Sequence, residues 1–236
     1  MNKNIWVYWS QGFDNAPPLV KECLKSVKHY NPNWNIIELT DVNLKEYISD
    51  VYHPGPLAAY SDIIRISLLN KYGGVWVDAT VLFNKPLDEW LPEYAPKGFF
   101  AFSKPTNRNN VCSWFLYGEK GNFLVDKWKE TVDNYWDMRQ KFHDYLWFHF
   151  CFDSCYNQLP EFKDKWDKVK KYNATWSPAS YDGSNPHVFA PYDSRHLSIV
   201  AKTVQNFTAP VYKLAHHNKH LPVNPQINSL FIKDII

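Results

Sequence analysis

The segment of residues 57–83 constrains the fold of this chain more than any other. Its first part has a helical pattern in which apolar side chains face almost every direction around the axis: Leu57, Ala58, Ala59, Tyr60, Ile63, Ile64, Ile66, Leu68 and Leu69. Gly73 and Gly74 then supply the left-handed stop that helices commonly need. Residues 75–83 are a β-branched and aromatic run, which predicts a strand. We therefore expect a mostly buried helix followed directly by a strand.

Two charged residues interrupt the apolar helix. Asp62 and Arg65 are three positions apart, so they share a face of the helix. Buried charges persist only when they are paired with each other or with a bound ligand. The pair therefore has two interpretations, an internal ion pair or a ligand contact.

The strand that follows carries a carboxylate among its apolar residues. With a side-chain period of two, Trp76, Asp78 and Thr80 point to the same face. A carboxylate in a central strand is costly unless it meets a metal, a cation or a sugar hydroxyl. We therefore expect Asp78 to have such a partner.

The remaining pattern alternates between strands and helices. Strands are expected at residues 5–9, 34–39, 75–83, 98–103 and 111–117, and helices from Pro17, at 42–48, around Asp62, and at 123–138 and 145–159. This alternation predicts a single α/β domain with a mostly parallel open sheet flanked by helices, mixed in direction toward its later strands. Ligands of such sheets bind beyond the carboxyl ends of the strands, which places residues 9–12 and 78–80 at one rim.

Composition narrows the class of ligand. Aromatic residues make up 17% of the chain, including 11 Trp and 15 Tyr, which is more than a core alone requires. Aromatic faces stack on bases and on sugars, so the excess favours nucleotide or carbohydrate ligands, with a large aromatic core as the alternative. A net charge of +2 gives no support to nucleic-acid binding.

The cysteines and the hydropathy pattern indicate in which cellular compartment the protein is expected. Cys23, Cys112, Cys151 and Cys155 are scattered, which indicates buried, reduced thiols in a cytosolic protein. No run approaches the ~18 apolar residues of a membrane span, and no secretory signal is evident. We expect a cytoplasmic protein, with attachment to the inner face of the membrane as an open alternative.

Residues 58–65 and 72–80 resemble the sugar-nucleotide-binding region of glycosyltransferases with a DxD motif. They are most similar to bacterial capsular polysaccharide synthesis proteins, as are residues 5–12, 16–20 and 212–214. The resemblance implies a GT-A type fold and transfer of a sugar from a nucleotide donor, a UDP-hexose, with retention of configuration. The implied acceptor is a glycan or a lipid-linked oligosaccharide in capsular or cell-surface polysaccharide synthesis. Residues 1–90 would bind the donor and residues 91–236 the acceptor, within one domain.

The resemblance also implies roles for single residues. Trp9 matches an aromatic residue that stacks on the donor base, and Gln11 lies in the same loop. Asp62 and Arg65 match a pair that holds the donor sugar or ribose. The other implied donor contacts, which include Asp78 as the first acid of the motif, are Trp76, Asp78, Thr80 and Lys213.

The expected cofactor is a divalent metal, Mn²⁺ or Mg²⁺. Asp78 would be one ligand, but Thr80 stands where a second acid is usual, and one carboxylate holds such a cation weakly. His216 and His217, with His220 nearby, would supply further ligands; the alternative is a solvated turn. Arg65 and Lys213 are the cations available to a departing diphosphate.

Two further features have competing interpretations. Asp144 opens an aromatic helix, so it is a candidate catalytic residue beside Asp78, contacting sugar hydroxyls, or it caps the helix. The lysine-rich residues 163–171 fit peripheral contact with an anionic membrane or a solvated helix face.

Two other classes of protein fit parts of the pattern. A carbohydrate-binding module would use the aromatic residues without catalysis, but it gives no reason for a buried Asp62 and Arg65. A nucleotidyltransferase would need a basic, glycine-rich loop after the first strand, whereas residues 10–14 contain one glycine and no lysine or arginine.

Overall fold

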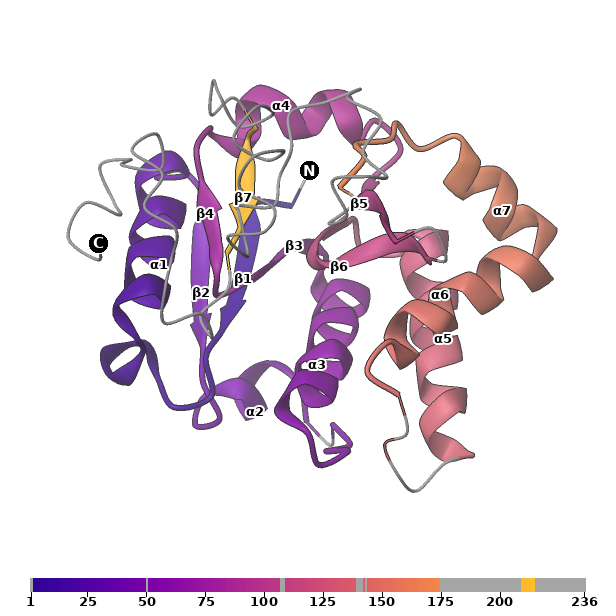
Figure 1. The fold of residues 1–236 in the computed structure, drawn as a ribbon, viewed down its shortest axis with the longest axis horizontal. Helices are drawn as coiled ribbons and strands as arrows, with labels where there is room; N and C mark the ends of the chain where they lie inside the picture. The colour runs from indigo at the N-terminus through magenta and orange to yellow at the C-terminus, as the bar shows by residue number, and fades with distance from the viewer. Residues whose placement is uncertain are drawn as a thin grey trace, which may run out of the picture.

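A computed structural model describes residues 2–49, 51–106, 109–138, 142, 144–174 and 209–214 (Figure 1). The strands are β1 (Asn4–Tyr8), β2 (Asn35–Leu39), β3 (Gly74–Asp78), β4 (Val81–Phe83), β5 (Phe99–Thr106), β6 (Asn109–Gly118) and β7 (Val211–Lys213). The helices are α1 (Pro18–Tyr30), α2 (Leu44–Tyr47), α3 (Leu57–Tyr72), α4 (Leu87–Tyr94), α5 (Phe123–Asp137), α6 (Trp147–Gln158) and α7 (Pro160–Asp167), with a short 3-10 helix at Phe13–Asn15. The helices and strands expected from the sequence are present within a few residues, except that the strand expected at residues 75–83 is divided in two.

The main sheet has the order β2-β1-β3-β6-β5. β1 pairs in parallel with β2 and with β3, whereas β6 runs antiparallel to both β3 and β5. The fold class, α/β with an open sheet flanked by helices, is confirmed. The sheet is parallel among β1, β2 and β3 and mixed in direction at its later strands, as the sequence predicts. Only a few residues separate β5 from β6, and a parallel crossover needs a dozen or more.

The expected strand at residues 75–83 is two strands. β3 ends at Asp78, a turn follows at Ala79 and Thr80, and β4 pairs with β7 in a separate two-stranded sheet. β4 leaves the main sheet because its bonding partners lie elsewhere. The Phe83 N–H donates to the Ser26 hydroxyl of α1 at 2.9 Å, in addition to the ladder with β7.

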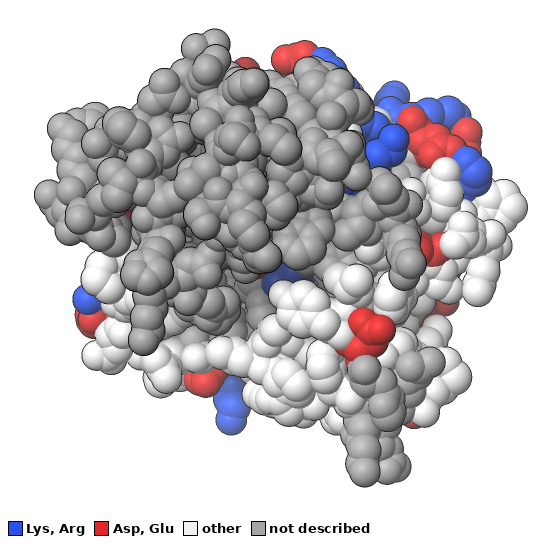
Figure 2. All heavy atoms as spheres, viewed as in Figure 1, with Lys and Arg blue, Asp and Glu red and all other residues white. Residues whose placement is uncertain are grey.

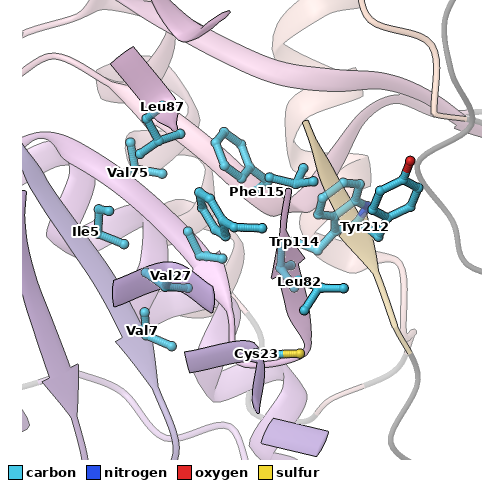
Figure 3. Close-up of a cluster of buried hydrophobic side chains, with 14 of the residues drawn as sticks. Ile5, Val7, Cys23, Val27, Val75, Leu82, Leu87, Trp114, Phe115 and Tyr212 are labelled. Atoms are coloured by element: carbon cyan, nitrogen blue, oxygen red, sulfur yellow. The ribbon is translucent and has the colours of Figure 1, made fainter. Parts of the chain in front are cut away.

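Hydrophobic side chains cover both faces of the sheet. One cluster joins the sheet to α1, α4 and the β4-β7 pair, and Figure 3 shows part of it. The other joins the sheet to α2, α3, α5, α6 and α7. Much of the aromatic excess lies here, since Trp6, Trp76, Trp128, Trp147 and Trp166 are fully buried.

The lysine-rich segment around α7 forms ion pairs. Lys163 pairs with Asp167, and Lys168 with Asp164 at 2.7 Å, each one helical turn apart. Figure 2 shows basic residues interspersed with acidic residues at the upper right, near the place where Figure 1 draws α7. These ion pairs offset the lysine charges, which favours the solvated helix face, and contact with an anionic membrane stays a prediction. Among the described residues, no helix combines the length and apolarity needed to cross a membrane.

All four cysteines are buried free thiols, as the sequence predicts. Burial raises the pKa of the Cys23 thiol to about 12, and the pKa of the Cys112 thiol is raised for the same reason. Both thiols are therefore protonated and unreactive near neutral pH.

Candidate functional site

A cavity of about 420 Å³ opens beyond the carboxyl ends of β1 and β3. Because β1 and β3 are parallel, residues 8–10 and 76–80 meet at one rim, as expected for this class of sheet. The first half of α3, the start of α6 and the end of β7 complete the wall. The lining residues outside the strand ends are Leu57, Ala58, Ser61, Asp62, Arg65, Ser113, Tyr145, His149, Lys213 and Leu214.

Asp78 accepts hydrogen bonds on both carboxylate oxygens. Its Oδ1 accepts from Arg65 Nη2 at 3.1 Å and from Trp76 Nε1 at 3.0 Å. Its Oδ2 accepts from Lys213 Nζ at 2.8 Å. The carboxylate predicted to need a partner therefore has two cations and an indole. Burial alone would raise the pKa of Asp78, but Lys213 and Arg65 outweigh it and hold the pKa below its usual value.

Arg65 lies between two carboxylates. Its Nη1 is 2.6 Å from Asp62 Oδ1, and its Nη2 reaches both Ser61 Oγ and Asp78 Oδ1 at 3.1 Å. The guanidinium also lies over the Trp76 ring, 5.3 Å from its centroid. The predicted Asp62–Arg65 pair is confirmed, and the structure extends it to Asp78.

Asp62 differs from Asp78 in its ionisation. It is buried, and the guanidinium that it contacts is shared with the other acid. Burial raises the pKa of Asp62 to about 7, against the opposing effect of Arg65, and the Asp78 charge adds to the rise. The net charge of the cavity wall therefore changes near neutral pH.

Lys213 connects the end of the described chain to the acidic strand end. Its Nζ donates to Thr80 Oγ1 at 2.8 Å as well as to Asp78. The backbone fixes this arrangement, because Lys213 pairs with Val81 in the β4-β7 ladder and the Leu214 N–H donates to the Thr80 carbonyl at 2.9 Å. The sequence assigns these residues to the donor site but does not indicate their contact.

His149 is a site residue that the sequence analysis missed. It lies on α6 and lines the cavity, and its buried Nδ1 has no hydrogen-bond partner among the described residues. Burial and the nearby Arg65 lower its pKa to about 4, despite the opposing charge of Asp78, so the imidazole is neutral near pH 7. The sequence signal for His149 is a polar ring within an aromatic run.

The other predicted residues divide into two groups. Trp9, Trp76 and Thr80 line the cavity. Gln11 and Asp144 are exposed and do not line it. The Asp144 carboxylate accepts a hydrogen bond from the Leu146 N–H at 2.7 Å, so it stabilises the turn before α6. The catalytic role of Asp144 and the donor contact of Gln11 stay predictions.

The described residues do not fit a divalent metal. They contain no group of three or more potential ligands among His, Cys, Asp and Glu. Both oxygens of Asp78 are engaged, chiefly by cations that a metal would have to displace. His216, His217 and His220 lie outside the described residues.

Comparison with known proteins identifies a family and several relatives of this chain. The model of the capsular polysaccharide synthesis protein family matches residues 1–224. The chain is 26% identical over 162 residues to the O-glycosyltransferase braB of Annulohypoxylon truncatum, and 26% identical over 159 residues to the glycosyltransferase afumC of Aspergillus fumigatus. These alignments cover 58% and 57% of this chain but only 38% and 41% of the relatives.

A search of solved structures found two further similarities. One is a glycosyltransferase involved in the glycosylation of the major capsid of PBCV-1, with a TM-score of 0.48 and 11% identity, covering 89% of this chain and 92% of the other. The other is mouse xyloside xylosyltransferase 1, with a TM-score of 0.48 and 10% identity, covering 94% and 100%. With nearly its whole length matched by one family model, this chain belongs to the capsular polysaccharide synthesis protein family.

Proposed function

We propose that this chain is a glycosyltransferase that moves a hexose from a UDP donor to a glycan or lipid-linked oligosaccharide, with retention of configuration. The observation that carries the proposal is Asp78 held between Arg65 and Lys213 in a cavity at the carboxyl ends of two parallel strands. Two buried or half-buried cations at such a place suit the diphosphate of a sugar nucleotide.

The reaction breaks the bond between the anomeric carbon and a β-phosphate oxygen. Negative charge then develops on the diphosphate, and Lys213 and Arg65 are placed to stabilise it. The acceptor hydroxyl forms the new bond from the departing side, and its proton passes to the phosphate oxygen. This route requires no separate general base, and in the described part of the cavity Asp78 is already occupied as an acceptor.

Aromatic and imidazole groups suit the base and the sugar. Trp9 and Trp76 lie along the cavity, where an indole face stacks on a base or a sugar. The neutral His149 accepts or donates a hydrogen bond to a sugar hydroxyl without adding charge. Tyr145 lines the opening with 73% of its surface exposed, which suits an incoming acceptor sugar.

We further propose that residues 1–90 bind the donor and residues 91–236 the acceptor. The acidic and basic residues of the site come from β3 and α3, with Lys213 as the exception. A Mn²⁺ or Mg²⁺ cofactor, as the resemblance implies, would have to displace Lys213 from Asp78 and take its other ligands from His216 and His217.

A UDP-sugar panel with an Asp78→Ala variant tests the proposal. We expect turnover of at least one donor, thermal stabilisation by UDP, and a fall of about 100-fold in kcat/KM for Asp78→Ala, because both cations lose their anchor. Asp164→Asn, an exposed acid on α7, is the matched control and should keep full activity.

Two outcomes would contradict the proposal. Full activity of Asp78→Ala would show that this site takes no part in the reaction. Glycan binding without any response to UDP would instead favour a carbohydrate-binding module.

A further inference from the structure

The Lys213 ammonium lies where two side chains converge from the acidic strand end. Its Nζ is 2.8 Å from Asp78 Oδ2 and 2.8 Å from Thr80 Oγ1. These are the two positions, separated by one residue, from which oxygen atoms would hold a cation in a DxD-type motif. Here the cation is part of the protein.

A divalent ion and this ammonium exclude each other. A metal on Asp78 Oδ2 at its usual distance would lie within about 5 Å of the ammonium, and like charges so close in a half-buried site repel strongly. The other oxygen, Oδ1, already accepts from Arg65 and Trp76. Thr80 contributes no negative charge to offset a second cation.

We propose that Lys213 replaces the divalent metal and binds the diphosphate of the donor directly. This inference rests on the proposed function. An ammonium has three N–H donors, and within the described structure two of them are taken by Asp78 and Thr80. The third is available to a phosphate oxygen, since Lys213 lines the cavity. The lysine then bridges the acidic strand end and the diphosphate.

The geometry also explains why a lysine on a separate strand serves here. The β4-β7 ladder places Lys213 opposite Val81, and the main-chain bond from Leu214 to Thr80 ties the two ends together. The Lys213 side chain is only 22% exposed. Its charge is therefore fixed in position before the ligand arrives, and little rearrangement is needed on binding.

Arg65 does not fill the same role. Its two terminal nitrogens are engaged by Asp62, Ser61 and Asp78, and its side chain is 6% exposed. Arg65 therefore positions Asp78 and acts on the diphosphate through its charge alone, whereas Lys213 is the cation with a donor directed to the ligand.

Two binding measurements on the unmodified chain test the inference. In electron paramagnetic resonance, the signal of free Mn²⁺ should be undiminished by an equal concentration of protein, with or without UDP. In calorimetry, the Kd for UDP should agree within twofold between EDTA and Mn²⁺. Loss of Mn²⁺ signal, or UDP binding that requires Mn²⁺, would overturn the inference and leave the proposed function standing.

Variants give an independent test. Lys213→Met should weaken UDP binding at least tenfold in EDTA, Lys213→Arg should retain most of it, and Lys25→Met, which removes an exposed lysine of α1, should leave it unchanged. The double variant Thr80→Asp with Lys213→Met presents two acids and no ammonium, so it should gain Mn²⁺ binding. Unchanged UDP affinity in a folded Lys213→Met protein would overturn the inference. Absence of UDP binding under every condition would instead refute the proposed function, and the inference with it.

Discussion

Arg65 contacts two carboxylates that ionise differently. Asp78 also has Lys213 and Trp76 as donors, so its charged form is stabilised and its pKa is lowered. Asp62 is more deeply buried, and burial raises its pKa to about 7 although the Arg65 guanidinium opposes the rise. One cation therefore supports one permanent anion and one acid that titrates near neutrality.

This difference predicts a pH-dependent contribution of Asp62 to stability. The pKa of Asp62 is about 7 in the folded chain and about 4 when unfolded, so the folded state holds a proton that the unfolded state releases between these values. The stability contributed by the protonated acid is complete below pH 4 and is lost as the pH rises through 7. Thermal unfolding of the unmodified chain and of Asp62→Asn at several pH values should show this loss of stability.

The Tm of the unmodified chain minus that of Asp62→Asn should fall between pH 5 and pH 8. The asparagine amide mimics the neutral acid, and all other titrating groups are common to both proteins, so they cancel in the difference. Of the neighbours, Asp78 and His149 have pKa values below this window. A flat difference would mean that Asp62 is an ordinary ionised partner of Arg65.

The spacing of residues along the sequence predicted part of the site. Asp62 and Arg65 are three residues apart, so the helix itself brings them together and the sequence was sufficient. The contact of Lys213 with Asp78 spans 135 residues and depends on the path of the chain. His149 shows no unusual spacing either, and its role follows only from the packing of α6 against α3 and β6.

Between α3 and β3, two glycines let the chain reverse within a very small space. Gly73 and Gly74 have φ values of 72° and 106°, which side chains rarely adopt. A Cβ on Gly74 would lie 2.6 Å from the Asn4 carbonyl oxygen in β1. The glycine pair therefore permits the close approach of β1 and β3, which places residues 8–10 beside Asp78.

Replacing Gly74 by alanine should destabilise the chain by about 1–3 kcal/mol through backbone strain, with a further loss from the contact with β1. Gly55→Ala is the matched control, because Gly55 has a similar φ of 102° but no atom within 4 Å of the added Cβ. Urea unfolding of both variants separates the cost of backbone strain, which both share, from the cost of the steric clash with β1, which only Gly74→Ala has. Equal losses would show that the β1-β3 contact tolerates the methyl group.

The sequence predicted the types of the elements better than their partners. Apolar periodicity and the glycine pair were enough for α3 and for the start of β3. The division of residues 75–83 into β3 and β4 was missed because the two-residue period continues across the turn at Ala79 and Thr80. The turn becomes apparent only when β7, more than 100 residues later, pairs with β4.

β7, the last described strand, supplies the final part of the candidate site, because Lys213 at its end lines the cavity. β7 lies beside β4 (Figure 1), and its Tyr212 is buried in the same cluster as β4. The Ala209 N–H donates to the Tyr212 hydroxyl at 2.8 Å, which fixes the entry into the strand. The packing of β7 in the core therefore also determines the position of Lys213.

Tyr212→Phe should therefore affect both stability and ligand binding. Removing the hydroxyl leaves the buried Ala209 N–H without this acceptor, which costs about 1–3 kcal/mol in the free energy of unfolding. If β7 sets the position of Lys213, UDP affinity should fall as well, measured well below the Tm. Tyr156→Phe is the control, because its hydroxyl bonds at the exposed surface beside α7 and should cost under about 0.5 kcal/mol. If Tyr212→Phe is as stable as the unmodified chain, the Ala209–Tyr212 hydrogen bond does not contribute to the stability of the core.

The strand order β2-β1-β3 has a consequence for the origin of the cavity. The connection from β1 to β2 runs through α1 on one face of the sheet, and the connection from β2 to β3 runs through α3 on the other. From β1 the chain continues to β2 on one side of the β1-β3 pair, and from β3 it continues to β5 and β6 on the other side. This opens a crevice at the topological switch point whatever side chains line it. Exchange of lining residues would change which ligand binds, while the crevice itself would persist as long as the winding of the chain is kept.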